Sequence, residues 1–286
     1  MDTKTVRRFL VTGVSSGLGR ALAEAALERG HVVVGTVRRA QDGEAFEALA
    51  PGRALARQVD VTDDAAVFAM VDEVEAAVGP IDVVVACAGY GHEGTVEESS
   101  MDELRRQFDV NVYGVVATVK AALPRMRARR AGHLIAISSM AGFITMPGLA
   151  FYHASKYAVE GFMESLSKEV GPLGVRVTVV APGSFRTDWA GRSMVRTPLE
   201  IPDYEGVFGP LRAARLEADG NQLGNPAAGA AAVLEIVDAP EPPVHLVLGS
   251  DALRLISNGR AAVDAEIEAW EALSRSTDFA EGAQIA

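Results

Sequence analysis

The sequence predicts an α/β fold, a single-domain doubly wound parallel sheet of about seven strands with helices on both faces. Short apolar runs with the length of buried strands alternate along the chain with longer segments of helical periodicity. Glycines or Gly-Pro pairs stand at several junctions, where a strand turns into a helix or a helix stops. No repeat or linker interrupts this alternation, so residues 1–286 are expected to form one domain.

The composition is that of a globular protein with an excess of acids. The chain has 38 acidic and 27 basic residues and a formal charge of -11. We therefore expect neither nucleic acid nor an anionic membrane as the main partner, because both attract basic surfaces. Cys87 is the only cysteine, which excludes an internal disulfide and suits a reducing compartment. The N-terminus lacks a signal-peptide pattern and no apolar run is long enough to cross a bilayer, so the expected localisation is cytoplasmic.

The first strand and the first helix enclose a glycine-rich turn. Phe9-Leu10-Val11 is an apolar run, Gly13, Gly17 and Gly19 follow it, and residues 18–27 have helical periodicity. Glycines let the backbone approach a phosphate closely, and a helix N-terminus presents free N–H groups and the positive end of its dipole. The spacing differs from the Gly-x-Gly-x-x-Gly dinucleotide fingerprint, and an ordinary βα turn is the alternative. The position after the first strand favours a phosphate site.

The second strand, predicted at residues 31–37, closes a right-handed βαβ unit. At the end of this strand a dinucleotide-binding fold places the residue that contacts the adenosine ribose. An acid there suits a free 2′-hydroxyl, whereas an arginine accommodates a 2′-phosphate. This chain has Arg38 and Arg39 and no acid, which favours NADP(H) over NAD(H). Two solvated arginines at a strand end are the alternative.

The same alternation continues toward the C-terminus. Further strands are predicted at 55–59, 81–86, 133–137, 175–181 and 245–249, and further helices at 63–78, 100–130, 152–170 and 226–237. Asp60, Gly89 and Ser139 come just after the ends of three of these strands. Open parallel sheets bind ligands outside the carboxyl ends of their strands. We therefore expect these residues and the glycine-rich turn at one edge of one sheet.

Tyr152 and Lys156 are four residues apart, so on a helix they share a face, one turn from each other. An ammonium group beside a phenol favours the phenolate, which predicts a lowered tyrosine pKa and a proton donor and acceptor usable near neutral pH. A hydroxyl from Ser139 could hold the oxygen that is protonated. The pair alone is common on amphipathic helices, so its interpretation depends on the neighbouring motifs.

Residues 184–225 break the regular pattern. Prolines and glycines are frequent there, together with apolar and aromatic side chains such as Trp189, Met194 and Phe208. A long irregular stretch at a ligand-binding edge is either a lid or a surface loop. The aromatic content favours a lid over a hydrophobic substrate. Residues 251–286 are expected to form an acidic, helical C-terminal extension.

With these residues in place, the chain resembles the compact single-domain branch of the short-chain dehydrogenase/reductase (SDR) family, which has a Rossmann fold. The resemblance extends from about Arg8 to Gly249, and its motifs occur in the family's order. They are the Thr-Gly-x-x-x-Gly-x-Gly loop at 12–19, the adenine-contacting acid Asp60, the asparagine Asn111, the serine Ser139, the pair Tyr152 and Lys156, and Pro-Gly-x-x-x-Thr at Pro182, Gly183 and Thr187. One departure is Ala86-Cys87-Ala88-Gly89, where the family usually has Asn-Asn-Ala-Gly, so two side-chain amides are lost.

The resemblance implies which residues act on the substrate and which bind the cofactor. Catalysis is expected from Asn111, Ser139, Tyr152 and Lys156, without a metal. Contacts to NADP(H) are expected from Gly13, Ser15, Ser16, Gly17, Leu18, Gly19, Arg38, Asp60, Val61, Ala88, Gly89, Tyr152, Lys156, Pro182, Gly183 and Thr187.

The resemblance also implies a reaction, a hydride transfer between the nicotinamide and a carbonyl or alcohol. The carbonyl oxygen would lie between Ser139 and Tyr152 and take its proton from Tyr152. Lys156 would hold the nicotinamide ribose, and Asn111 would organise a water-mediated proton route.

The features outside these motifs look most like the hydroxysteroid and retinol dehydrogenase-like members of the family. They are the long segment after Gly183 and the acidic tail, and they imply a bulky hydrophobic alcohol, ketone or aldehyde as substrate. The family also implies a homodimer or homotetramer. Two alternatives stay open. One is a dinucleotide-sensing protein of the same fold without turnover, and the other is an enzyme like the sugar-nucleotide epimerases, which share the Tyr-x-x-x-Lys pair.

Overall fold

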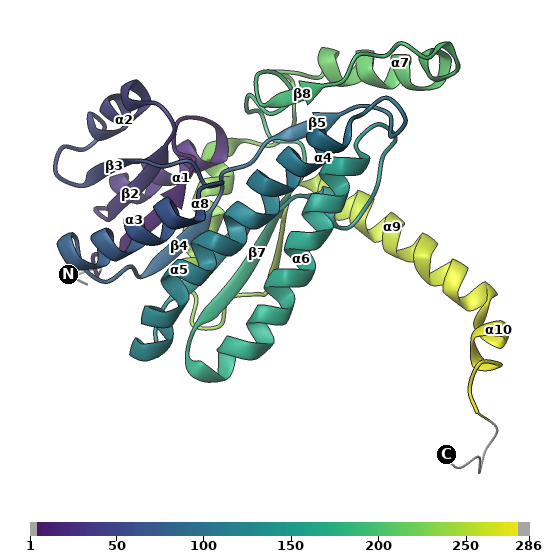
Figure 1. Ribbon diagram of the computed structural model, residues 1–286. Helices are drawn as coiled ribbons and strands as arrows, with labels where there is room; N and C mark the ends of the chain where they lie inside the picture. The colour runs from purple at the N-terminus through teal and green to yellow at the C-terminus, as the bar shows by residue number, and fades with distance from the viewer. Residues whose placement is uncertain (1–4, 280–286) are drawn as a thin grey trace.

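The computed structural model describes residues 5–279 and contains the seven-stranded parallel sheet that the sequence predicts (Figure 1). The strands stand in the order β3-β2-β1-β4-β6-β7-β9, and all neighbouring pairs are parallel. Their bounds are β1 Arg8–Thr12, β2 Val32–Val37, β3 Ala54–Gln58, β4 Val83–Ala86, β6 His133–Ile137, β7 Arg176–Pro182 and β9 His245–Leu248.

Helices cover both faces of this sheet (Figure 1). One face carries α1 Gly17–Glu28, α2 Ala40–Glu47 and α8 Pro226–Asp238, and the other carries α3 Asp64–Ala77, α5 Gly114–Arg129 and α6 Ala150–Val170. In β1, Leu10 packs into the cluster with α3, α5 and α6, while Phe9 and Val11 pack with α1 and α8. Alternate residues of a strand point to opposite faces, so β1 is apolar throughout because both of its faces are buried.

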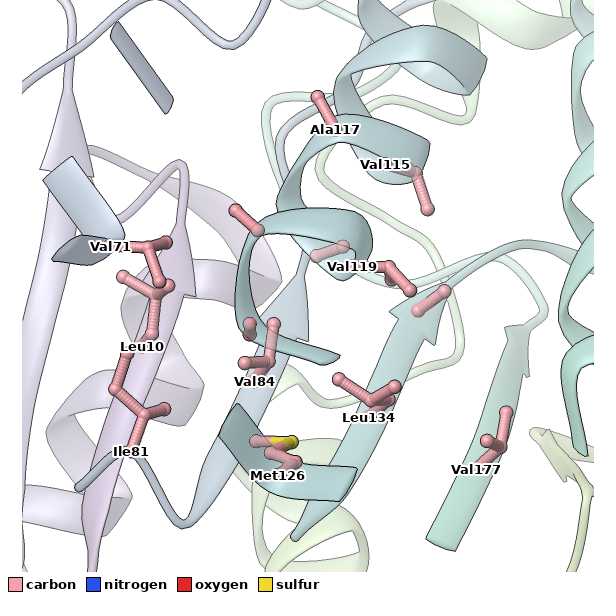
Figure 2. Packing of buried hydrophobic residues seen from close by; sticks show 14 of the residues in the cluster. Leu10, Val71, Ile81, Val84, Val115, Ala117, Val119, Met126, Leu134 and Val177 are labelled. Atoms are coloured by element: carbon pink, nitrogen blue, oxygen red, sulfur yellow. The ribbon is translucent and has the colours of Figure 1, made fainter. Parts of the chain in front are cut away.

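Figure 2 shows from close by the cluster that lies between the sheet and the helices α3, α5 and α6. Leu10, Val84 and Leu134 come from three neighbouring strands, and Val119 and Met126 of α5 pack against them. These five side chains are at most 1% exposed. The sheet beneath the functional edge is therefore rigidly supported.

The chain order creates a crevice beside the carboxyl ends of β1 and β4. From β1 the chain moves through β2 to the edge strand β3, and it then returns to place β4 on the other side of β1. Parallel sheets bind ligands at such a reversal of direction. The glycine-rich turn follows β1, Ala88 and Gly89 follow β4, and Ser139 follows β6. They therefore lie along this edge.

The helix predicted at 100–130 is divided in the structure. α4 Met101–Phe108 begins at a capping box between Ser100 and Glu103, as the sequence pattern predicts. A π-helical turn at Asp109–Tyr113 follows and leads into α5. Such a wider turn is an insertion into a regular helix, and helical periodicity alone does not reveal it. Asn111 lies in this turn.

Residues 184–225 are more regular than the sequence predicts. β8 Met194–Arg196 pairs in parallel with β5 Gly91–Glu93, apart from the main sheet. α7 Pro202–Glu217 then begins with a proline in its first turn, where the missing N–H is tolerated. In Figure 1 this unit lies beyond the carboxyl ends of the strands. The glycines and prolines of α7 concealed its periodicity, and the short helix α2 was missed as well.

The C-terminal helices leave the body of the protein. Ala252 and Ile256, early in α9 Ser250–Ala269, pack against Ile144. The rest of α9 and α10 Glu271–Arg275 extend outward (Figure 1), and Trp270 between them is 63% exposed. Residues 1–4 lie outside the described residues, and so do residues 280–286, which are the end of the expected C-terminal extension. Within residues 5–279, no helix has the length and apolar content needed to span a membrane.

Candidate active site

Ser139, Tyr152 and Lys156 converge at the crevice. Ser139 follows β6 and caps the short 3-10 helix Met140–Gly142, where its Oγ accepts a hydrogen bond from the N–H of Ala141 at 3.1 Å. Its hydroxyl group also lies near enough to Tyr152, in the first turn of α6, to lower the pKa of the Tyr152 hydroxyl. Lys156, one turn further along α6, has its Nζ 5.7 Å from the centre of the Tyr152 ring. The predicted set therefore shares one place.

The protonation of Tyr152 differs from the sequence-based prediction of a lowered pKa. Burial raises the pKa of Tyr152 to about 12, and the neighbouring polar groups of Ser139 and Trp189 only partly oppose this. Lys156 is not among the groups that lower this pKa, and its Nζ donates to the carbonyl oxygen of Ile137 at 2.9 Å. Burial also lowers the pKa of Lys156 to about 8. Removal from water disfavours the charged form of both groups.

Asn111 is held in place by a complete set of hydrogen bonds. Its Oδ1 accepts from the N–H of Tyr90 at 3.0 Å, and its Nδ2 donates to the carbonyl oxygen of Tyr90 at 3.0 Å and to Oγ of Ser155 at 3.3 Å. The side chain is 1% exposed. In this structure Asn111 thus fixes the chain that leaves β4, and its role in proton transfer stays a prediction.

The glycine-rich turn has the geometry of a phosphate cradle. Gly13 and Gly17 have φ angles of 77° and 63°, which favour glycine. A Cβ on Gly19 would lie 2.4 Å from the carbonyl oxygen of Gly13, so only glycine fits there. Ser16, the N-cap of α1, makes no side-chain capping bond, which leaves the first N–H groups of the helix for an anion. Ser15 and Leu18 belong to the same turn.

The segment that has Ala86-Cys87 in place of Asn-Asn is held by its backbone. Thr12 Oγ1 accepts hydrogen bonds from the N–H groups of Cys87 and Ala88 at 2.9 and 3.0 Å. These bonds hold the end of β4 against the end of β1, where a Cβ on Gly13 would lie 3.0 Å from Cα of Ala88. Burial raises the pKa of the Cys87 thiol to about 11, which indicates a packing residue and not a reactive thiolate.

The predicted adenosine end of the crevice carries Arg38 and Arg39, which differ in their ion pairs. Arg39 pairs with Asp42 at 2.7 Å, whereas the exposed Arg38 has no carboxylate partner among residues 5–279. Asp60 Oδ1 accepts from the N–H and the hydroxyl of Thr62 at 3.0 and 2.9 Å. Val61 is buried beside Gly114, where a Cβ would lie 2.8 Å from its Cγ2.

The Pro-Gly-x-x-x-Thr segment joins this edge to residues 184–225. Pro182 ends β7, and the N–H of Gly183 donates to the carbonyl oxygen of Leu248 at 2.8 Å. Thr187 lies beside the glycine-rich turn, since a Cβ on Gly17 would be 3.9 Å from Cβ of Thr187. The structure therefore brings the predicted cofactor-binding residues of β1, β4 and β7 together.

The structure adds two residues to the site that the motifs did not reveal. Trp189 lies with its ring centre 5.1 Å from that of Tyr152, and the sequence showed it only as one aromatic residue of the expected lid. Glu93 is fully buried beside three arginines of residues 184–225. No spacing pattern in the sequence signals this cluster. No group of three or more potential metal ligands occurs in the part of the chain that the structure describes.

Comparison with known proteins assigns the family. The model of the short chain dehydrogenase family matches residues 7–195. The chain belongs to the short-chain dehydrogenase/reductase family. The predicted family, the Rossmann fold and the class of oxidoreductase are thereby confirmed.

Curated relatives and a solved structure match this SDR over most of its length. Oxidoreductase BOA17 of Botryotinia fuckeliana is 36% identical over 93% of this chain and 97% of its own. The 3-ketodihydrosphingosine reductase of Bacteroides thetaiotaomicron is 35% identical over 84% of this chain and 87% of its own. Human retinol dehydrogenase 8 is 33% identical over 84% of this chain and 80% of its own. A short-chain dehydrogenase from Streptomyces avermitilis has a TM-score of 0.89 at 38% identity and covers 96% of this chain and 100% of its own.

Two further matches name different cofactors. An NADPH-dependent 3-dehydrocapnine reductase of Ornithobacterium rhinotracheale is 35% identical over 72% of this chain and 75% of its own. An SDR from Burkholderia phymatum, solved in complex with NAD, has a TM-score of 0.81 at 23% identity and covers 93% of this chain and 97% of its own. At this identity the likeness shows the fold alone. Members of this fold therefore bind either nicotinamide dinucleotide.

Proposed function

We propose that this SDR is an NADP(H)-dependent alcohol dehydrogenase or carbonyl reductase for a hydrophobic substrate. The observation that carries the proposal is the convergence of Ser139, Tyr152 and Lys156 beside the phosphate cradle. A hydroxyl pair and a buried ammonium are the groups that protonation of a carbonyl oxygen requires. The cradle fits a dinucleotide because its glycines leave room and its N–H groups have no side-chain cap.

The bound nicotinamide supplies or accepts the hydride. Ser139 and Tyr152 hold the carbonyl oxygen between them, and their hydrogen bonds stabilise the negative charge that develops on it. Tyr152 donates its proton to that oxygen in reduction and acts as the base in oxidation. Lys156 would hold the ribose hydroxyls of the bound cofactor, and Asn111 would support a water-mediated route that returns the proton.

Arg38 supports the choice of NADP(H). It follows β2, where the adenosine ribose is contacted, and it is exposed and free of a carboxylate partner within the described residues. Because Asp42 neutralises Arg39, Arg38 is the cation left for a 2′-phosphate. The name of the NADPH-dependent relative is consistent with this choice.

The substrate class rests on the lining of the site and on the relatives. The indole of Trp189 and the thioether of Met194 pack over Gly91 next to Tyr152, and they provide an apolar wall for residues 184–225 acting as a lid. Names of relatives include a 3-ketodihydrosphingosine reductase and a retinol dehydrogenase. We therefore favour a long or bulky hydrophobic ketone, aldehyde or alcohol.

The two alternatives are less well supported. A sensor without turnover has no need of the complete set of Ser139, Tyr152 and Lys156. An epimerase-like enzyme is expected to carry a larger substrate-binding unit after the sheet, and β9 is followed here by extended helices.

The test is Tyr152→Phe with Tyr157→Phe as the matched control on the same helix, where the ring is 44% exposed. Loss of the acid should lower kcat by about 100-fold to 10,000-fold while NADPH still binds, as measured by its fluorescence enhancement. The control should retain activity. Substrates are found with a panel of hydrophobic ketones and alcohols followed at the nicotinamide absorbance. Undiminished turnover by Tyr152→Phe would falsify the proposed mechanism.

A further inference from the structure

Trp189 covers the hydroxyl group on which the proposed reaction depends. Its ring centre is 5.1 Å from that of Tyr152 at an interplanar angle of 52°, and its indole lies near enough to the Tyr152 hydroxyl to lower the pKa of that hydroxyl. Tyr152 is left 6% exposed. A carbonyl compound that approaches Tyr152 therefore meets the indole first.

The indole rests on a surface built to receive it. A Cβ on Gly91 would lie 3.0 Å from Cζ2 of Trp189 and 2.7 Å from Cε of Met194. Glycine at this position of β5 thus lets both side chains lie flat on the β5–β8 pair. The backbone N–H of Trp189 donates to Thr187 Oγ1 at 3.4 Å. The backbone at Trp189 is therefore tied to the predicted cofactor side of the crevice.

The rest of the segment is anchored by buried charge. The carboxylate of Glu93, 0% exposed, pairs with Arg196 and Arg215 at 2.7 Å, and Arg212 lies 3.9 Å away. Arg215 also donates to the carbonyl oxygen of Pro147. Breaking such a buried cluster costs several times more free energy than breaking one neutral hydrogen bond. Opening the site by lifting β8 and α7 is therefore disfavoured relative to moving one side chain.

We infer that Trp189 is a cap on Tyr152 which the carbonyl oxygen of the substrate displaces, and that the displaced indole then forms one wall of the apolar pocket. The inference rests on the proposed function and names the residue that selects its substrates. A long or bulky apolar group regains contact with the moved ring, whereas a small ketone displaces the cap without that gain. Trp189 thus disfavours small carbonyl compounds.

The contact itself is tested without any substrate. The chain has two tryptophans, and the other one, Trp270, is 63% exposed on the projecting tail. In a Trp270→Phe background the emission therefore reports on Trp189 alone. Adding Tyr152→Phe removes the hydroxyl beside the indole, and we expect a shift of the emission maximum or a change in its intensity. Adding Tyr157→Phe instead should change neither. An emission spectrum that is the same with and without the Tyr152 hydroxyl would overturn the cap.

Displacement is tested by kinetics with NADPH and straight-chain methyl ketones, from butanone to the twelve-carbon dodecanone. Trp189→Phe keeps a smaller ring that covers less of Tyr152, so KM for the dodecanone should fall about fourfold, the factor for roughly one methylene of ring contact that is no longer displaced, with kcat within twofold. Trp189→Ala also removes the wall, so the preference for dodecanone over butanone in kcat/KM should drop at least fivefold. Trp270→Phe should match the wild type. A tenfold lower kcat at unchanged KM in Trp189→Phe overturns displacement, because the N–H would then act in the transition state.

The emission and the kinetic experiments distinguish a failure of the cap from a failure of the proposed function. If no carbonyl compound is turned over but the emission responds to Tyr152→Phe, the proposed activity is wrong and the contact of Trp189 with Tyr152 stands. Thermal unfolding of each variant shows that it is folded. If the emission does not respond to Tyr152→Phe while turnover is normal, the cap is wrong and the proposed activity stands.

Discussion

Lys156→Met should stabilise the fold while it abolishes turnover. Lys156 is 7% exposed, and burial lowers its pKa to about 8. A buried ammonium is held in the folded state at the expense of stability because it has lost its water. Methionine has a similar shape and no charge, so the substitution removes this penalty together with the ammonium of the proposed catalytic set.

The size of the effect follows from the pKa. A fall from 10.5 to about 8, at 1.36 kcal/mol per pH unit, corresponds to ~3 kcal/mol of destabilisation at pH 7. The hydrogen bond from Nζ to the carbonyl oxygen of Ile137 is lost as well, which offsets about 1 kcal/mol. The expected gain at pH 7 is therefore about 2 kcal/mol in the free energy of unfolding.

The gain should depend on pH. Below about pH 8 Lys156 is protonated in both the folded and the unfolded state, so the full penalty is present. Between pH 8 and 10.5 the folded protein releases this proton first and the penalty fades. The advantage of Lys156→Met over the wild type is thus greatest below pH 8 and is lost toward pH 10.5.

Urea unfolding at pH 7 and pH 9.5, followed by far-UV circular dichroism, measures this difference. Lys168→Met is the matched control, because Lys168 lies on the same helix with its side chain 73% exposed and pairs with Glu164. It should change stability by less than 1 kcal/mol at either pH. A Lys156→Met protein that is less stable than the wild type at pH 7, or whose difference is the same at both pH values, refutes the reasoning.

Two further predictions concern the charged groups at the ends of the site. Glu93→Gln should lower the free energy of unfolding by about 3 kcal/mol in urea, because its arginine partners are left buried beside a neutral amide. Asp102→Asn, which breaks an exposed ion pair, should cost less than 1 kcal/mol, and equal losses would contradict the buried-cluster argument. Arg38→Ala should weaken NADPH binding about tenfold or more and leave NADH within twofold, since a charged hydrogen bond to phosphate is lost. Arg39→Ala, whose side chain is already paired with Asp42, is the control in the same titrations, and equal losses of both cofactors would exclude a 2′-phosphate contact by Arg38.

The sequence was sufficient for the main sheet because its strands are buried on both faces. Runs such as 9–11 and 81–86 are continuously apolar or nearly so, which is the pattern of strands in a parallel sheet covered by helices. The secondary-structure prediction failed at two places where the local sequence pattern does not show the structure. The π-helical turn at Asp109–Tyr113 adds one residue to an otherwise periodic helix. The β5–β8 pair joins residues about a hundred positions apart, and its partners have no alternation to reveal it.

The site was predictable in its positions and not in its protonation. Ser139, Tyr152 and Lys156 were placed by motif spacing and by the rule that ligands bind at strand ends. The pKa of Tyr152 was not, because the sequence shows the neighbouring ammonium and hides the burial. Trp189 and Glu93 were missed for the same reason: each acts through a neighbour that is distant along the chain.

Burial explains the charge state of the proposed catalytic pair and favours one direction of the reaction. The same loss of water raises the pKa of Tyr152 to about 12 and lowers that of Lys156 to about 8. At neutral pH the phenol is therefore protonated and the ammonium is still mainly charged, which is the state that gives a proton to a carbonyl oxygen. Oxidation needs the phenolate, and the burial of Tyr152 opposes its formation. The ionisation of this chain's own residues thus suits carbonyl reduction under neutral conditions.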